Sequence, residues 1–191
     1  MTFWNYYLLS IIIVYLSAFF IRNLKTYFSI KTSIRGRSAK LTLSLVLSTL
    51  VYLITILHLF LPNTLNIAGK ISFLEIPILQ YTGYGLVLVA LLIGLAALYE
   101  MRNSWRVGIK YDQKTDLVTT GIYSISRNPY FLSYDFLFTG IFFIYPSTVL
   151  LTLLFGLMIT FHLMIMEEEK YLGHIQKKFY LKYKEKVGRY L

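Results

Sequence analysis

Four apolar stretches separated by polar segments define the pattern of this chain. The first three cover residues 3 to 21, 41 to 61 and 77 to 98, and each is about as long as a helix that crosses a bilayer core of roughly 30 Å. The fourth extends from 130 to 166 and is interrupted by Pro146. This pattern predicts an all-α integral membrane protein.

The stretch from 130 to 166 is too long for a single crossing. A continuous helix over its 37 residues would measure about 55 Å at ~1.5 Å per residue. A turn at Tyr145-Pro146-Ser147 would divide it into a fourth and a fifth helix that form a helical hairpin. The fourth helix is then short, and we expect it to begin below the membrane surface, where protein or a water-filled cavity covers the non-helical backbone that precedes it.

Basic residues lie almost entirely on one side of this five-helix arrangement. Six Lys or Arg fall within 22 to 40, five within 99 to 128 and seven in the tail after 166, whereas the opposite side carries only Lys70. Because Lys and Arg are retained on the cytoplasmic side, we expect the N-terminus outside and the C-terminus in the cytoplasm. The first stretch has no basic n-region and no small-residue cleavage site, so we interpret it as a span and not as a signal peptide.

The tail from 168 to 190 is predicted to form an amphipathic helix. Its apolar residues, including Tyr171, Ile175 and Phe179, recur at three- and four-residue steps. Its lysines would face anionic headgroups or solvent, which is typical of a helix at the membrane interface.

Composition excludes several other classes of protein. Hydrophobic residues make up 57% of the chain and charged residues 15%, against about 25% charged in soluble proteins. The net charge of +10 follows from the basic loops, so it does not indicate nucleic-acid binding, which needs a basic face on a soluble domain. The chain has no cysteine, and its histidines, His58, His162 and His174, have no metal-ligand spacing. We therefore expect no metal site.

Residues 117 to 135 concentrate polar and aromatic residues just before the fourth apolar stretch. This segment contains Thr-Gly-Ile-Tyr at 120 to 123 and Arg-Asn-Pro-Tyr-Phe at 127 to 131. An Asn-Ser-Trp-Arg-Val-Gly segment precedes it at 103 to 108, and a Glu-Glu pair follows the predicted hairpin at 168 to 169. The tail ends with Tyr180, Tyr183, Val187, Arg189 and Tyr190.

The order of these motifs resembles that of the small integral-membrane methyltransferases that use S-adenosylmethionine. These are the isoprenylcysteine carboxyl methyltransferases and phospholipid N-methyltransferases, with their many bacterial relatives. The resemblance covers roughly residues 80 to 191. It implies a single membrane domain, 1 to 191, in which 1 to 76 is an N-terminal two-helix part and 77 to 191 is the methyltransferase-like core. It also implies a protein of the bacterial inner membrane.

The resemblance further implies which residues bind S-adenosylmethionine and its product S-adenosylhomocysteine. They belong to the segment before the fourth helix, the Glu pair and a Gly-Tyr-Gly segment in the third span: Val118, Gly121, Ile122, Tyr123, Arg127, Asn128, Pro129, Tyr130, Glu168, Glu169, Gly83 and Gly85. Arg127 and Asp135 are the candidate catalytic residues.

Several of these residues suit methyl transfer by their chemistry. The planar guanidinium of Arg127 can bind the cofactor carboxylate with two hydrogen bonds. Pro129 fits the first turn of a helix, whose free N–H groups attract anions. Tyr123, Tyr130 and Tyr134 could present ring faces to the sulfonium. Each residue also has a simpler explanation, because Arg anchors and aromatic belts are common at membrane interfaces.

The acids need partners. Glu167, Glu168 and Glu169 are consecutive and would repel one another, so we expect a counter-charge nearby. One member can bind the ribose hydroxyls or the ammonium of the cofactor while its neighbour pairs with Arg127 or Arg189. The resemblance favours the second and third acids as the functional pair.

Asp135 is the only acid well inside an apolar run, which makes it a functional hypothesis by default. It would serve as a general base for an amine acceptor, whereas a carboxylate acceptor needs none. A structural role as a hydrogen-bond partner explains it equally well. The Gly-Tyr-Gly segment at 83 to 85 likewise has a simpler explanation, because glycines in membrane helices usually mark close helix packing.

The sequence does not identify the methyl acceptor. The carboxyl methyltransferases of the family usually have His at the position of Asn128, and a Phe-Gly pair of their tail falls here on Gln176-Lys177. We expect a lipophilic acceptor, such as a prenylcysteine carboxylate, a lipid amine or a similar small molecule, to enter between the third and fourth helices. The alternatives are an NADPH-dependent enzyme like the membrane sterol reductases, and a non-enzymatic membrane scaffold.

Overall fold

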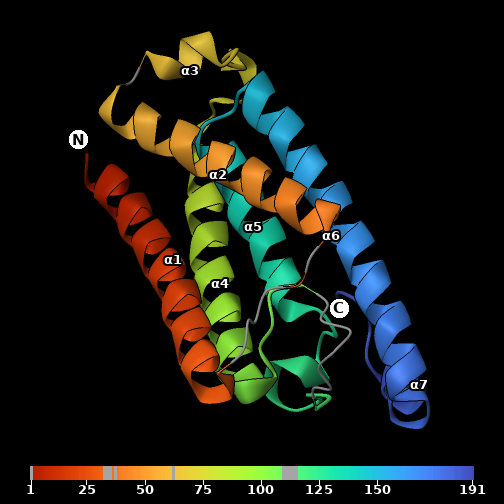
Figure 1. The fold of residues 1–191 in the computed structure, drawn as a ribbon. Helices are drawn as coiled ribbons and strands as arrows, with labels where there is room; N and C mark the ends of the chain where they lie inside the picture. The colour runs from red at the N-terminus through yellow and green to blue at the C-terminus, as the bar shows by residue number, and fades with distance from the viewer. Residues whose placement is uncertain (1, 32–35, 37, 62, 109–115) are drawn as a thin grey trace.

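A computed structural model describes residues 2–31, 36, 38–61, 63–108 and 116–191. The described residues form a bundle of helices (Figure 1), as the hydrophobic pattern predicts. The helices are α1 (Phe3–Ile30), α2 (Ala39–Phe60), α3 (Thr64–Ile67), α4 (Pro77–Met101), α5 (Pro129–Ile144), α6 (Thr148–Ile175) and α7 (Lys177–Lys186), with 3₁₀ turns η1 (Ser72–Leu74), η2 (Arg102–Ser104) and η3 (Gly121–Ser124). Pro62, two of the loop arginines, Arg35 and Arg37, and part of the predicted polar connection, 109–115, lie outside the described residues.

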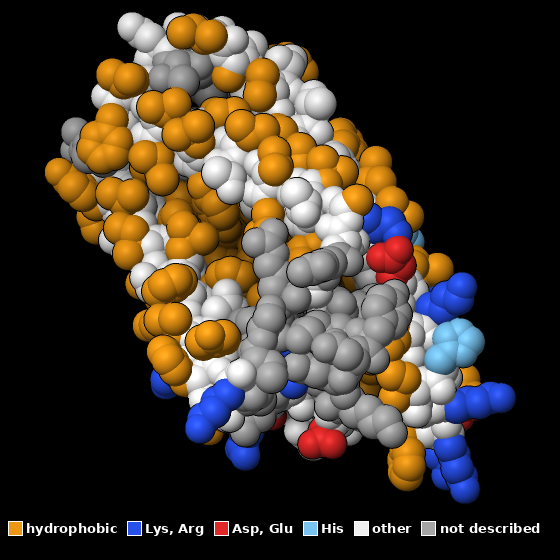
Figure 2. All heavy atoms as spheres, viewed as in Figure 1, with side chains coloured by type: hydrophobic (Ala, Val, Ile, Leu, Met, Phe, Trp, Pro, Cys, Tyr) orange, Lys and Arg blue, Asp and Glu red, His pale blue; other side chains and the backbone are white. Residues whose placement is uncertain are grey.

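Four of these helices, α1, α2, α4 and α6, are long and apolar enough to cross a membrane. Helix α5 occupies the position of the predicted fourth helix, but it has only 16 residues, or roughly 24 Å at 1.5 Å per residue. Its length alone therefore does not make it a span. Hydrophobic side chains cover the helices, whereas Lys and Arg side chains gather at the end of the molecule that carries α7 (Figure 2). That distribution is typical of an integral membrane protein.

Helix α5 lies at the centre of the bundle. Leu137 and Ile141 are fully buried and Phe138 is 2% exposed, in a core to which α1, α2, α4 and α6 also contribute. Helix α4 packs along α5, α1 packs against α4, and α2 packs against α6. The end of α5 where Pro129 lies is therefore surrounded by other helices, which suits a site built around its first turn.

Close packing between α4 and α5 depends on glycine. A Cβ added at Gly83 would lie 2.7 Å from the carbonyl oxygen of Gly140, and one added at Gly140 would lie 2.8 Å from the carbonyl oxygen of Gly83. Small residues of this kind let two membrane helices approach each other closely. This contact joins the third and fourth helices of the sequence interpretation, and the acceptor entrance expected between them stays a prediction.

The tail differs from the predicted continuous helix over 168 to 190. Helix α6 ends at Ile175 and α7 begins at Lys177, after Gln176 leaves helical geometry. The last residues are not helical: the carbonyl oxygen of Gly188 accepts the backbone N–H of Arg127 at 3.0 Å. The prediction of one helix is therefore wrong, because tertiary hydrogen bonds hold the end of the chain against the segment before α5.

Candidate functional site

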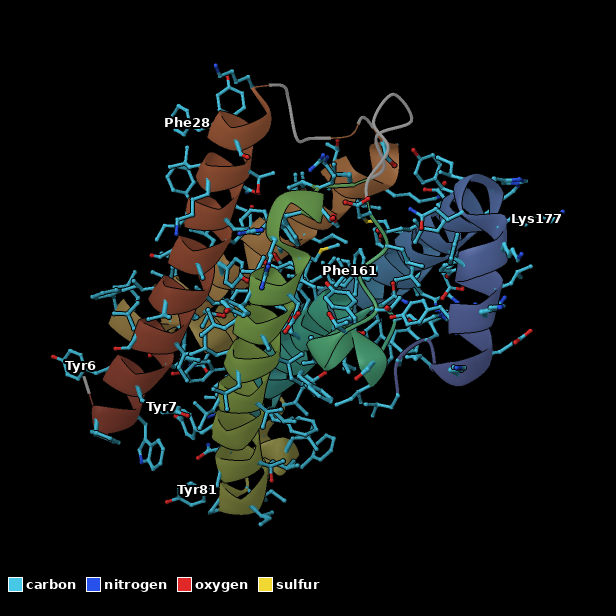
Figure 3. All side chains as sticks on the ribbon, turned by 90° about the horizontal axis from the view of Figure 1, so that it is seen from below. Tyr6, Tyr7, Phe28, Tyr81, Phe161 and Lys177 are labelled. Atoms are coloured by element: carbon cyan, nitrogen blue, oxygen red, sulfur yellow. The ribbon has the colours of Figure 1, made fainter. Side chains whose placement is uncertain are left out.

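A cavity of about 170 Å³ lies at the end of the bundle where the segment before α5, the end of α6 and α7 meet. Its polar side carries side chains from all three: Asp116, Arg127, Asn128, Glu168, Glu169, Tyr180 and Tyr183. Its apolar side carries rings and aliphatic groups, among them Phe131, Met164 and the ring of Phe161, which is labelled in Figure 3. Leu41, Ser44, Leu45 and Ser48 extend this side onto α2. The cavity thus joins charged groups to a wall made by membrane helices.

A buried ion pair organises the polar side. Both Nε and Nη2 of Arg127 donate to Oε1 of Glu169, at 3.1 and 2.7 Å, and the two side chains are 6% and 9% exposed. Arg189 donates from Nη2 to the other oxygen of Glu169 at 2.9 Å. The carboxylate therefore has the counter-charge that the sequence predicts, and it has two of them. Charge-assisted bonds of this kind are short and strong.

Arg127 also holds the tail. Its Nη1 donates to the backbone carbonyl oxygens of Val187 at 2.6 Å and Lys184 at 3.3 Å. All three nitrogens of the guanidinium are thus used by the protein itself. Arg127 also lines the cavity, and its role as a ligand of the cofactor carboxylate stays a prediction.

The three consecutive acids have different surroundings. Glu167 pairs with Lys40 of α2, and both side chains are partly exposed. Glu169 is held by the two arginines. Glu168 is half-buried, lines the cavity and makes no hydrogen bond or ion pair with any described residue. Successive residues of a helix point about 100° apart, so one short sequence provides a surface pair, a structural pair and a carboxylate that faces the cavity.

Aromatic rings form the floor of the cavity. The ring of Tyr130 lies edge-on to Trp105 at 4.8 Å between centroids and to Tyr134 at 5.1 Å. Trp105 is fixed by its indole N–H, which donates to Oδ1 of Asn23 at 2.7 Å and so joins α1 to this wall. Tyr123 also lines the cavity. Ring faces in such a position attract cations.

Helix α7 closes the cavity with two buried tyrosines. The hydroxyl of Tyr183 donates to the backbone carbonyl oxygen of Tyr123 at 2.5 Å. Burial raises the pKa of Tyr180 to about 12 and that of Tyr183 to about 12. Both hydroxyls are therefore protonated at neutral pH. The hydrogen bond to the Glu169 carboxylate raises the pKa of Arg189, which stays charged.

The turn η3 depends on Gly121. Its φ is +57°, which favours glycine, and a Cβ there would overlap the side chain of Glu100. Gly121 and Ile122 shape the turn and Pro129 begins α5, and none of the three lines the cavity. The other predicted residues of this part of the chain and the Glu pair are brought together on the cavity wall: Val118, Tyr123, Arg127, Asn128, Tyr130, Glu168 and Glu169.

Three residues of the predicted site, in the third span and the fourth helix, do not line the cavity. Gly83 and Gly85 do not line the cavity, because they lie near the start of α4, whereas the cavity lies at its end. Asp135 is also absent from the cavity wall. Its negative charge acts on Tyr190, whose pKa is raised first by burial and then by this carboxylate. Oδ1 of Asp135 is buried and accepts no hydrogen bond from the part of the chain that the structure describes.

Sequence reasoning missed several residues of the cavity. Trp105, Tyr180 and Tyr183 belong to the motif segments, yet their place on the wall follows only from the tertiary structure. Ser44 and Ser48 of α2 line the cavity as well, and no pattern in the sequence distinguishes them from other serines of that helix.

The cavity and the apolar helices define a membrane protein with a site at one end of its bundle. Residues 78–179, more than half of the chain, match the sequence model of the phospholipid methyltransferase family. The chain belongs to this family, as the order of its motifs predicts. Membership makes it a membrane methyltransferase and argues against the reductase and scaffold alternatives. A search of the curated proteins finds no match to this chain.

Proposed function

We propose that the protein transfers a methyl group from S-adenosylmethionine to a lipophilic acceptor at the cytoplasmic membrane face. The observation that supports this most directly is the cavity itself, whose lining combines the carboxylate of Glu168, which no described residue pairs, with apolar side chains of membrane helices. A charged, water-soluble cofactor and a lipophilic acceptor need these two environments within one site. Phospholipid methyltransferase is the description of the family.

The residues present fit this cofactor. Glu168 offers a free carboxylate for the ribose hydroxyls or for the ammonium group, and Tyr123, Tyr130 and Tyr134 offer rings to the sulfonium. Arg127 and Glu169 do not bind the cofactor in this proposal, but hold α6 and the tail in place around it. Gly83 and Gly85 have no part in the site.

When bound, the cofactor supplies a methyl group already activated by the positive charge on sulfur. Glu168 and the tyrosine rings would hold the cofactor, which would give this methyl group to a lone pair of the acceptor and leave as the neutral thioether. The protein aligns the two partners and excludes water from the cavity. An amine, thiol or phenol acceptor also releases a proton, whereas a carboxylate acceptor does not.

The acceptor end of the cavity is made by α2, α5 and α6. Leu41, Phe131, Phe161 and Met164 line it, which suits the hydrocarbon part of a prenylcysteine, a lipid amine or a similar small lipophilic molecule. Asp135 is not placed to take a proton from an acceptor here. For acceptors that release one, the proton passes to water or to Glu168, a carboxylate on the wall that no described residue pairs.

We also propose how the chain is inserted. Helix α5 completes five crossings of a bacterial inner membrane and forms a helical hairpin with α6. The N-terminus lies outside the membrane and the C-terminus lies in the cytoplasm. The first turn of α5 lies below the membrane surface, under α7 and the tail. Residues 1 to 76 form the N-terminal two-helix part of one membrane domain, and 77 to 191 form the catalytic core.

Calorimetric titration of the purified protein in detergent tests the cofactor. S-adenosylhomocysteine is expected to bind with micromolar affinity, and NADPH, titrated in parallel, is expected not to bind. Binding of NADPH alone would make the cavity a reductase site. A folded protein that binds neither would favour a role other than catalysis.

A further inference from the structure

Helix α7 has two faces of opposite character. Tyr180 and Tyr183 on its inner face are 3% and 8% exposed and line the cavity. The exposed remainder of the helix carries a single acid, Glu185, and five lysines. These are Lys177, Lys178, Lys182, Lys184 and Lys186, which we call the lysine face.

Apolar side chains stand among these lysines. Phe179 is 73% exposed and Leu181 is 48% exposed. Exposure of a large ring to water is unfavourable on a purely solvated helix face. An interfacial helix, in contrast, inserts such residues between headgroups and holds its lysines in the headgroup layer. The combination favours a membrane surface as the partner over a soluble polyanion.

The position of α7 agrees with this partner. Helix α6 has 28 residues, or about 42 Å, and only about 30 Å of it fits in the hydrocarbon core. Its last turns therefore reach the headgroup layer, and α7 follows after the single residue Gln176. In the view onto this end of the bundle, α7 lies at the rim and Lys177 points away from the other helices (Figure 3).

The same helix is a wall of the candidate site. Tyr183 is hydrogen-bonded to the backbone of Tyr123, and Arg127 donates to the carbonyl oxygen of Lys184 at the end of α7. A movement of α7 away from the bundle would break these bonds and open the cavity. Whatever holds α7 in place from outside therefore favours the closed cavity.

We propose that the lysine face docks on anionic lipid headgroups and that this docking couples the charge of the surrounding membrane to cofactor binding. The docking stands on the charge and exposure of α7, and the coupling rests on the proposed function. Each basic residue near an anionic surface contributes about 1 kcal/mol, or about fivefold in affinity. By reciprocity, a ligand that favours the closed cavity strengthens the docking, and the docking strengthens the binding of the ligand.

The absence of cysteine from the chain gives a direct test of docking. An environment-sensitive fluorophore on Phe179→Cys would report on α7 after reconstitution into vesicles of phosphatidylcholine alone or with about one-third phosphatidylglycerol. A label on Phe73→Cys, 80% exposed in η1 away from α7, is the control. We expect a blue shift in the anionic vesicles at 179 only. Equal spectra at 179 in the two membranes would overturn the docking.

A matched pair of variants tests the lysines themselves. Lys178→Gln combined with Lys182→Gln removes two charges from the lysine face, and Lys25→Gln combined with Lys31→Gln removes two exposed charges at the end of α1. The first pair is expected to abolish most of the blue shift and the second to preserve it. An equal loss in both would mean a general charge effect and not docking of α7.

The coupling is measured as the affinity for S-adenosylhomocysteine in nanodiscs of the same two lipid compositions. We expect at least threefold tighter binding in anionic nanodiscs for the wild type, and a difference below 1.5-fold for the Lys178 and Lys182 double variant, with unchanged affinity in neutral lipid. The same affinity in both lipids for the wild type would contradict the coupling. Failure to bind in either lipid would contradict the proposed function, while the fluorescence result would still decide the docking.

Discussion

Arg127 and Glu169 lie 42 positions apart in the chain and form a buried pair in which two guanidinium nitrogens donate to one carboxylate oxygen at 3.1 and 2.7 Å. The pair connects the segment before α5 to α6, and Arg127 also donates to backbone carbonyl groups at the end of α7 and beyond it. Two motifs that sequence analysis assigns to cofactor binding therefore meet in a contact that supports the cavity. The acid beside them, Glu168, lines the same cavity and pairs with no described residue.

Removal of one partner of this pair is expected to destabilise the protein. Arg127→Ala leaves Glu169 with Arg189 alone and frees two tail carbonyl groups, and breaking a buried pair costs about 3–5 kcal/mol. The thermal midpoint in detergent should fall well below that of the wild type, and binding of S-adenosylhomocysteine should be lost with it. Lys40→Gln breaks the partly exposed pair with Glu167 and should cost about 1 kcal/mol or less. Equal midpoints for the two variants would contradict the structural role of Arg127.

Alanine variants of Gly83 and Gly85 distinguish a role in helix packing from a role in cofactor binding. A Cβ at Gly83 meets the backbone of α5, whereas a Cβ at Gly85 meets nothing within 4 Å. Gly83→Ala is expected to lower the thermal midpoint because α4 and α5 must move apart, and Gly85→Ala should leave it unchanged or raise it. Folded Gly85→Ala should bind S-adenosylhomocysteine as the wild type does. A selective loss of binding in Gly85→Ala would restore the cofactor role that the sequence suggests for this segment.

The number of crossings determines whether the two ends of the chain lie on the same side of the membrane. Five crossings place the two ends on opposite sides, and four place them on the same side. Tyr6→Cys and Leu191→Cys introduce single exposed thiols near the two ends, at positions that are 58% and 80% exposed. A membrane-impermeant maleimide added to intact cells should label the first and not the second. Labelling of both, or of neither until the cells are opened, would contradict the five-span proposal.

Asp135 is expected to be dispensable for cofactor binding. It does not line the cavity and its charge acts on Tyr190, so Asp135→Asn should keep the affinity for S-adenosylhomocysteine within about twofold of the wild type. The isosteric change also relieves a buried carboxylate oxygen that accepts no hydrogen bond from any described residue, so stability should not fall. If Asp135→Asn lost most of its affinity for S-adenosylhomocysteine at a normal thermal midpoint, Asp135 would have a role in cofactor binding.

The fold could be predicted where hydrophobicity is the dominant signal. The four long apolar helices and the start of α5 at a proline follow from the lengths of the apolar runs and from helix-capping preferences. The end of α6 could not be predicted, because the periodicity of the tail continues across Gln176. Burial of Tyr180 and Tyr183 against the cavity, a tertiary effect, determines how α7 is turned.

The site could be predicted as a set of motifs but not as a set of roles. The order of the motifs predicts that Arg127 and the Glu pair belong to the same site. In the structure these residues line the same cavity. Which of the two adjacent acids pairs with Arg127 depends on the rotation of α6 about its axis, which the sequence does not specify. The contribution of Ser44 from α2 depends on how two helices distant in sequence pack together.

The proposed binding of the cofactor by Glu168 is tested by titration of S-adenosylhomocysteine into two neighbouring variants. Glu168→Gln keeps the shape of the side chain and replaces the carboxyl group in the cavity by an amide, whereas Glu167→Gln removes a charge that pairs with Lys40 at the surface. A hydrogen bond to a charged group contributes about 1.5–3 kcal/mol, so Glu168→Gln should bind at least tenfold more weakly, with an unchanged thermal midpoint. Glu167→Gln should bind as the wild type does. Wild-type affinity in Glu168→Gln would contradict the account.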